Sequence, residues 1–232
     1  MKRIRQIVIA APDLEAARAE VEAKLGLTPC YRDPNVAHFG LENVMFAIGD
    51  QFLEIVTPRQ EGTAAGRHLE RNGPSPYMLI LQTDDLPADR ARIAGHEVRE
   101  VWKSERPDIS AVHFHPADMG ATILSLDEPV DPASWPWAGP EWCPPQERGR
   151  AAVLQAGFAA KKPSEFAAAW AVRLGLEAPV KRGGVNVLQL NESELVFHQA
   201  DADRLSSFGL KLPNFEPCSL EVAGTVFDIV PA

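Results

Sequence analysis

The sequence predicts an α+β protein built from repeated β-α-β-β-β modules. Residues 4–58 have the pattern of a strand, a helix and three further strands, and residues 77–129 repeat that order. A third copy begins after residue 150, where Leu174-Gly175-Leu176 matches Leu25-Gly26-Leu27. Hydrophobic residues make up 45% and charged residues 24% of the 232 residues, as is typical of a folded globular chain.

The first module opens with a β-rich run over residues 4–10. Asp13 is the predicted N-cap of a helix, which is expected to end at Gly26. Within it, apolar residues recur at helical spacing: Leu14, Ala17, Val21 and Leu25. Three extended segments, 37–40, 43–49 and 51–56, complete the module before Pro58.

The second module repeats these signals. Residues 77–83 have a strand pattern, and a short helix is expected to begin after Asp85 and to end at Gly95. Three extended pieces follow, over residues 96–102, 109–115 and 121–126.

Residues 131–149 differ in character, because repeated prolines there oppose regular structure. Three tryptophans in this stretch, Trp135, Trp137 and Trp142, indicate that it packs on another surface. We therefore expect a domain of two β-α-β-β-β modules over 1–130, a linker over 131–149 and a degenerate repeat over 150–232.

In the last part, Pro163 is expected at the first helical position. Residues 186–188 resemble residues 43–45, which supports the repeat. The segments 219–224 and 225–230 have the pattern of a fourth module reduced to little more than strands.

Charge and composition exclude several classes of protein. The 23 basic and 32 acidic residues give a net charge of −9, which argues against a nucleic-acid partner. No apolar run is long enough for a membrane span, and no signal peptide is indicated, so a cytoplasmic protein is expected. Cys30, Cys143 and Cys218 lack the spacing of a disulfide framework or a zinc site.

The paired modules, with PDLEAA after the first strand and FLEIVTP at the finish, resemble the vicinal oxygen chelate superfamily. This superfamily includes glyoxalases, extradiol dioxygenases and bleomycin-resistance proteins. The resemblance implies mixed sheets paired around a concave cleft, with a divalent metal held by side chains from the first and last strands of each module. The resemblance implies metal positions at Gln6, seven residues before Asp13, and at Glu54.

The second module departs from that pattern, because the corresponding positions are Met78 and Ser125. A thioether and a neutral hydroxyl are poor ligands for a hard or borderline ion. The sequence therefore leaves open whether a metal is bound, and does not distinguish Zn, Ni, Mn, Fe and Mg.

His113 and His115 are candidates for a further role. Strand alternation places both imidazoles on one face, opposite Val112 and Phe114, so both are expected to face the cleft. One of them would complete a metal shell with Gln6 and Glu54 or act as a general acid or base. The alternative is two histidines hydrogen-bonded on a strand.

The third and fourth modules have weaker candidates. Gln155 corresponds to Gln6, Asp228 corresponds to Glu54, and Glu221 is expected in the first strand of the reduced fourth module. His198 or Val196 would be the remaining position.

A separate group of basic residues follows Glu54 in the chain. Its members are candidates for binding a carboxylate or phosphate on a substrate tail, or for a solvated loop: Arg59, Arg67, His68 and Arg71.

Two functions remain open. The first is a small-molecule enzyme with lyase, isomerase or epimerase chemistry, in which Glu54 is base or ligand and His113 or His115 transfers protons. The second is a metal-free protein that binds or sequesters an apolar ligand in a cleft lined by Val8, Met78, Ile80 and Ser125. A homodimer in which the partner subunit supplies missing ligands is a further possibility.

Overall fold

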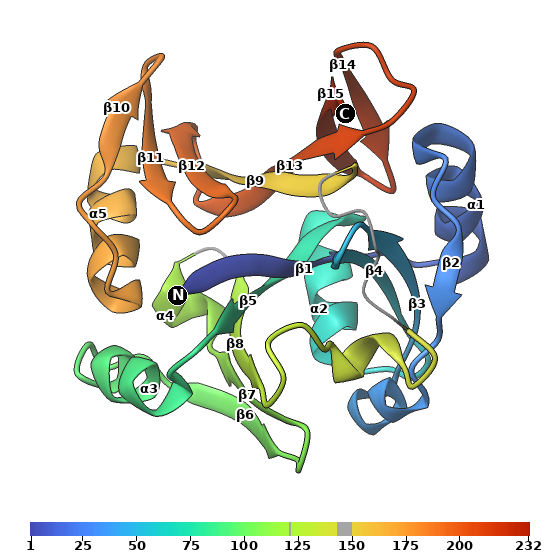
Figure 1. The fold of residues 1–232 in the computed structure, drawn as a ribbon, viewed down its shortest axis with the longest axis horizontal. Helices are drawn as coiled ribbons and strands as arrows, with labels where there is room; N and C mark the ends of the chain where they lie inside the picture. Colours follow the sequence, from blue (N-terminus) through green and yellow to red (C-terminus); the bar gives the residue numbers. More distant parts are fainter. Residues whose placement is uncertain (121, 143–149) are drawn as a thin grey trace.

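Two mixed β-sheets pack face to face in the computed structural model, which describes residues 1–120, 122–142 and 150–232 (Figure 1). The larger sheet has eight strands in the order β2-β3-β4-β1-β5-β8-β7-β6. The smaller has seven, in the order β10-β11-β12-β9-β13-β15-β14. This architecture confirms the predicted α+β class.

Each half of the chain forms one sheet. The first module comprises β1 (Lys2–Ala10), α1 (Leu14–Leu25), β2 (Pro29–Tyr31), β3 (Leu41–Ile48) and β4 (Gln51–Pro58). The second comprises β5 (Ser75–Thr83), α3 (Leu86–Ala94), β6 (Glu100–Glu105), β7 (Ile109–Phe114) and β8 (Ile123–Pro129). The third comprises β9 (Ala152–Ala160), α5 (Pro163–Leu174), β10 (Val180–Arg182), β11 (Val185–Gln189) and β12 (Glu194–Gln199). The fourth has no helix and comprises β13 (Arg204–Leu212), β14 (Cys218–Val222) and β15 (Thr225–Pro231).

Local signals explain where the helices begin and end. The Asp13 side chain accepts a hydrogen bond from the Ala16 N–H at 3.0 Å, and Gly26 ends α1 in the left-handed conformation at φ 65°. Asp85 caps α3 in the same way, and Pro163 opens α5. These boundaries agree with the predictions.

Several segments differ from the prediction. Residues 37–40 were expected to be extended, but residues 37–39 lie in the 3-10 helix η1 (Pro34–Phe39), which Asp33 caps and Gly40 closes. The stretch after β4 contains α2 (Ala64–Asn72), which Thr63 caps at the Gly66 N–H. Two further short helices were not predicted, α4 (Pro116–Met119) and the 3-10 helix η2 (Pro136–Ala138). The second strand of the second module, β6, begins at Glu100 instead of His96.

The fourth module also has a strand that was not predicted. Its first strand is β13, which pairs with β9, whereas Glu221 lies in β14 at the sheet edge. The expectation that Glu221 occupies a first strand is therefore wrong. The reason is that the alternation in residues 204–212 is interrupted by Ser206, Ser207 and Gly209.

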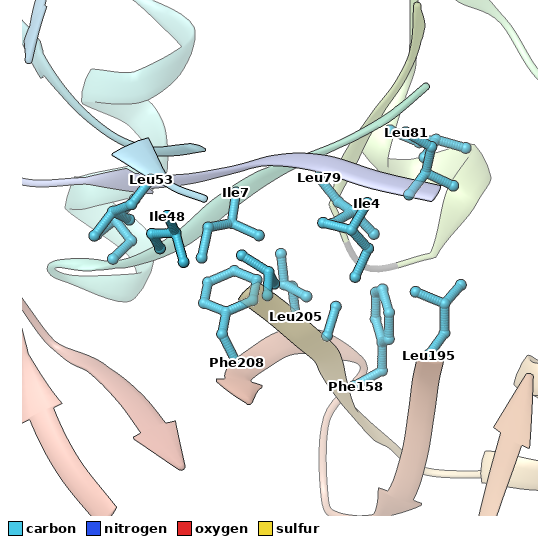
Figure 2. Packing of buried hydrophobic residues seen from close by; sticks show 14 of the residues in the cluster. Ile4, Ile7, Ile48, Leu53, Leu79, Leu81, Phe158, Leu195, Leu205 and Phe208 are labelled. Carbon is cyan, nitrogen blue, oxygen red and sulfur yellow. The ribbon is translucent and has the colours of Figure 1, made fainter. Parts of the chain in front are cut away.

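One hydrophobic core joins the two sheets. Ile4 and Ile7 of β1, which a register shift between Ile4 and Gln6 brings to the same face, meet Phe158 and Phe208 of the smaller sheet, and all four are fully buried (Figure 2). At opposite ends of the molecule α1 lies beside β14 and α3 lies beside α5 (Figure 1). These helices leave free the face of the larger sheet that points away from the smaller sheet, and that face is available to form a cleft.

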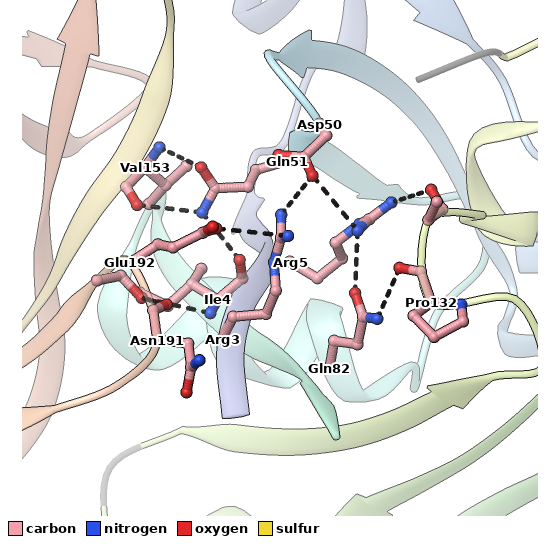
Figure 3. A network of polar contacts seen from close by, with 12 residues as sticks. Arg3, Ile4, Arg5, Asp50, Gln51, Gln82, Pro132, Val153, Asn191 and Glu192 are labelled. Carbon is pink, nitrogen blue, oxygen red and sulfur yellow. Dashed lines mark hydrogen bonds and ion pairs between the residues drawn. The ribbon is translucent and has the colours of Figure 1, made fainter. Parts of the chain in front are cut away.

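A buried polar network also crosses between the halves (Figure 3). The Gln51 amide group donates to Ile4 O at 2.8 Å and to Val153 O at 3.1 Å, and accepts from the Val153 N–H at 2.7 Å. Arg3 forms an ion pair with Asp50 at 2.7 Å.

None of the helices among the described residues has the length and apolar character needed to cross a membrane.

Candidate active site on the larger sheet

The concave face of the larger sheet presents matched residues from its two modules. In β1 and β4, Val8 pairs with Glu54, and in β5 and β8, Ile80 pairs with Ser125. Gln6 pairs with Ile80, and Val8 with Met78, across the antiparallel β1–β5 contact. The register therefore relates Gln6 to Met78 and Glu54 to Ser125.

Glu54 lies at the centre of an amide network. The Gln6 side-chain N–H donates to Glu54 Oε2 at 2.7 Å, and the Asn43 side-chain N–H donates to Oε1 at 2.6 Å. Burial raises the pKa of Glu54 to about 7, against the opposing effect of the two donors. Glu54 is therefore poised to exchange a proton near neutral pH.

A second buried carboxyl group, Asp127, was not among the predicted site residues. Its Oδ2 accepts the Trp137 indole N–H at 2.6 Å, and Ser125 donates to its Oδ1. Burial raises the pKa of Asp127 to about 7, although both donors favour the charged form. Period-two alternation from Ser125 is the sequence signal that would have placed it on this face.

The strap, defined here as residues 131–142, lies on the concave face. The Trp135 indole N–H donates to Gln6 Oε1 at 2.8 Å, and this tryptophan is only 1% exposed. The Trp142 ring meets Phe52 edge-to-face at 5.1 Å. The fully buried Arg5 holds the strap by donating to the carbonyl groups of Ala133 and Ser134.

An aromatic bridge of Phe39, Trp102 and His113 closes one side of the cleft. Phe39 of η1 meets Trp102 of β6 at 5.4 Å between ring centroids, so the two margins of the curved sheet touch. His113 lies against Trp102 at 4.3 Å. Burial lowers the pKa of His113 to about 3, so this imidazole is neutral at pH 7.

His115 does not share this position. Strand β7 ends at Phe114, and His115 instead caps α4, where its Nδ1 accepts the Ala117 N–H at 3.1 Å. The expectation that both histidines face one cleft is therefore incorrect, because the strand alternation stops one residue earlier.

A cavity of about 730 Å³ lies between the sheet, the strap and the bridge. This volume suits a small-molecule ligand. Its polar lining includes Gln6, Glu54, Asp127 and His113, and its apolar lining includes Val8, Met78 and Ile80. Ser125, which donates to Asp127, is fully buried and does not line the cavity.

The side chains at the four metal positions do not fit a divalent ion. Both Glu54 carboxylate oxygens accept amide hydrogens, and the Gln6 oxygen accepts the Trp135 N–H. Met78 and Ser125 add only a thioether and a hydroxyl group. Within the described residues, no group of three or more His, Cys, Asp and Glu side chains is arranged to hold a metal.

The smaller sheet carries an incomplete copy of the same arrangement. Gly157 pairs with Val196, and Gly209 pairs with Asp228, in the register of Val8 with Glu54. The position equivalent to Glu54 is therefore occupied by Val196 in the third module and by Asp228 in the fourth.

Cys30 is exposed and Cys218 half-buried, and Cys143 lies outside the described residues.

Residues 7–175 match the glyoxalase-like domain family. The chain belongs to this family. The glyoxalase-like chain is thus a member of the vicinal oxygen chelate superfamily, as its sequence indicated. It is 26% identical over 132 residues to an ethylmalonyl-CoA/methylmalonyl-CoA epimerase of Cereibacter sphaeroides, covering 54% of this chain and 97% of the relative.

Solved structures resemble it over different lengths. A methylmalonyl-CoA epimerase variant of Streptomyces coelicolor, in complex with 2-nitronate-propionyl-CoA, is 26% identical with a TM-score of 0.50, covering 55% of this chain and 97% of that one. A hypothetical protein from Staphylococcus aureus has a TM-score of 0.71 at 12% identity and covers 100% of both chains. A 4-hydroxymandelate synthase mutant of S. coelicolor has a TM-score of 0.69 at 12% identity, covering 92% of this chain and 71% of that one. The last two show the shared fold.

Proposed function

We propose that this glyoxalase-like protein is an isomerase or epimerase that moves a proton on a carbon acid next to a carbonyl group. The observation that carries the proposal is the pair of buried carboxyl groups, Glu54 and Asp127, at one cavity. Both have a pKa raised to about 7, where a group is effective both as acid and as base. The similarity to the epimerases supports the same reaction class.

The two carboxyl groups come from strands on opposite sides of the β1–β5 centre. Strands β4 and β8 are three strand spacings apart, roughly 14 Å along a flat sheet and less across a concave one. A ligand in the cavity therefore lies between Glu54 and Asp127. In the proposed reaction one carboxyl group acts as the base and the other as the acid, on opposite faces of the reacting carbon.

The chemistry follows from that placement. Ionised Glu54 removes the proton from the carbon, and the electron pair of the C–H bond moves into the carbonyl group to form an enolate. Protonated Asp127 then donates its proton to the opposite face, which inverts the carbon. Tyr77 lines the cavity, and burial raises its pKa to about 12, so its phenol stays protonated and is available to donate to the enolate oxygen.

The test is hydrogen exchange at the reacting carbon. Thioesters of 2-methyl-branched acids are incubated with the protein in D2O, and loss of the C–H signal is followed by proton NMR. We expect Glu54→Gln and Asp127→Asn each to slow exchange by roughly 100-fold, the scale of general acid–base catalysis. Glu61→Gln is the matched control, because Glu61 is an exposed carboxylate in the same lining.

A second candidate function, ligand binding without catalysis, is favoured by the apolar lining at Val8, Met78 and Ile80. In that case the buried carboxyl groups would serve recognition only. An absence of exchange with every thioester, together with saturable binding of an aromatic probe that Met78→Ala weakens, would favour binding over catalysis.

A further inference from the structure

A second groove adjoins the cavity. It has a volume of about 1430 Å³ and is lined by α2, the start of β5 and strands β12, β13 and β15 of the smaller sheet. Its lining shares four residues with that of the cavity: Ala64, Tyr77, Val101 and Ile123. The two spaces therefore meet, and one extended molecule has room to occupy both.

Three arginines face this groove from both halves of the chain. Arg67 and Arg71 lie one helical turn apart on α2, and Arg204 lies on β13. Arg67 donates to Gly62 O, and Arg71 donates to Arg67 O at 3.1 Å, so both contacts are with neutral carbonyl groups. Within the described residues none of the three guanidinium groups forms an ion pair.

The positive charge is locally in excess. Asp203 and Asp228 also line the groove, so three guanidinium groups face two carboxylates, and Asp203 Oδ1 accepts the Lys161 backbone N–H at 2.7 Å. The excess is notable in a chain whose net charge is −9. Like charges one turn apart weaken a helix slightly, so the α2 pair has no structural benefit that the contacts reveal.

Three of the six histidines also line the groove: His68, His115 and His198. Burial and, next, the charge of Arg71 lower the pKa of His68, and burial and Arg204 act in the same way on His198. Both His68 ring nitrogens already contact the chain, Nε2 at Ser75 Oγ and Nδ1 at the Asn72 amide group, so His198 is the imidazole next to an arginine that is suited to donate to the oxygens of an anion.

We infer that this groove binds the phosphorylated tail of an extended substrate whose reactive end lies in the cavity. A diphosphate offers several anionic oxygens, which suits guanidinium groups arriving from separate elements better than one carboxylate does. The inference rests on the proposed function, since the tail belongs to the same substrate. Its recognition residues nevertheless lie outside the proton-transfer site.

Calorimetric titration with adenosine diphosphate and with inorganic pyrophosphate tests the groove directly. The wild type is expected to bind both. Arg71→Gln and Arg204→Gln should each weaken binding roughly 10- to 100-fold, the scale of one charge-assisted hydrogen bond, and the double variant should weaken it further. Arg182→Gln is the matched control, because this exposed arginine pairs with Glu194 and lines neither space.

Absence of binding by the wild type, or equal losses in the Arg182→Gln control, would overturn the inference. The Glu54→Gln variant separates it from the proposed function, because adenosine diphosphate should bind this variant as tightly as the wild type. Diphosphate binding without hydrogen exchange on any thioester would leave the groove intact and contradict the catalytic proposal. Hydrogen exchange without diphosphate binding would contradict the inference about the groove and leave the catalytic proposal intact.

The link between the two spaces needs its own comparison. For a thioester that ends in a nucleoside diphosphate, the Arg71→Gln and Arg204→Gln double variant should raise KM and leave kcat nearly unchanged. For the same thioester truncated before the phosphates, the variant should match the wild type. Equal effects on both substrates would show that the arginines do not bind the phosphorylated tail.

Discussion

Glu54 and Asp127 show how burial controls a carboxyl group at the level of single residues. Each accepts two hydrogen bonds that favour the charged form, yet desolvation prevails and raises the pKa of each to about 7. Both groups therefore bind a proton in the folded chain at a pH where the unfolded chain has released it. Stability then depends on pH with a definite sign.

The free energy of unfolding should fall as pH rises from 5 to 8. The stabilising effect of a raised carboxyl pKa is complete below the unfolded value and is lost as pH passes the folded value, about 7 here. The expected loss is roughly 2–3 kcal/mol for each group. Urea unfolding followed by circular dichroism at the two pH values measures it.

Variants provide the control for this pH dependence. The double variant Glu54→Gln and Asp127→Asn should lose much less stability between pH 5 and 8, whereas Glu61→Gln should behave as the wild type does, because Glu61 is exposed. A wild-type stability that is flat or rises over this range would contradict the assignment of both groups.

At the level of elements, the strap is the part of the site that strand patterns do not describe. Its prolines and tryptophans predicted packing, but not that two indole N–H groups would donate to Gln6 and Asp127. Those contacts depend on how the strap lies across four strands. Such long-range placement has no periodic signal in the sequence.

Removal of one indole donor should expose this role of the strap. Trp137→Phe keeps a ring but leaves Asp127 without the N–H at 2.6 Å, so we expect a loss of roughly 1–3 kcal/mol. The loss should be larger at pH 8 than at pH 5, because an ionised carboxylate needs the donor more. Chemical denaturation at both pH values measures the difference.

The matched variant for this measurement is Trp142→Phe. Its ring would retain an aromatic contact with Phe52, and within the part of the chain that the structure describes Trp142 forms no hydrogen bond with Asp127. This variant should therefore show no pH-dependent excess. Identical pH profiles for the two variants would argue that Trp137 acts only by filling space.

The elements also show where prediction from sequence succeeds. Strands β1, β4 and β5 and helices α1 and α3 combine clear periodicity with capping residues, and all were predicted. Helix α2 buries only Ala65, so it has no apolar stripe to reveal it. Asp127 and Asn43 were not predicted as site residues, because the family's metal positions correspond to Ser125 and Glu54.

For the whole molecule, the shared core and the network of Figure 3 join the two halves. Asp50, at the β3–β4 turn, pairs with Arg3 at 2.7 Å and lies 3.7 Å from Arg5, which in turn holds the strap. Gly49 adopts a positive φ of 63° in this turn, and a side chain there would meet the Ala151 carbonyl oxygen at 2.4 Å. The turn thus fits closely against the second half.

Asp50→Asn should consequently destabilise the whole protein and not one sheet. Removing one partner from a largely buried ion pair leaves uncompensated charge, at a cost of roughly 3 kcal/mol. Calorimetry should show one unfolding transition for the wild type and for the variant, with a lower Tm in the variant. Two separate transitions in the wild type would show that the sheets unfold independently.

The strap has a further consequence, because it belongs to the chain whose cavity it lines. An intramolecular segment occupies its site at an effective concentration in the millimolar range, whatever the protein concentration. A ligand that requires the space of Trp137 must compete with that permanent occupant, and its apparent affinity falls accordingly. Ligands that leave the indole beside Asp127 are favoured, so the strap selects ligands by size.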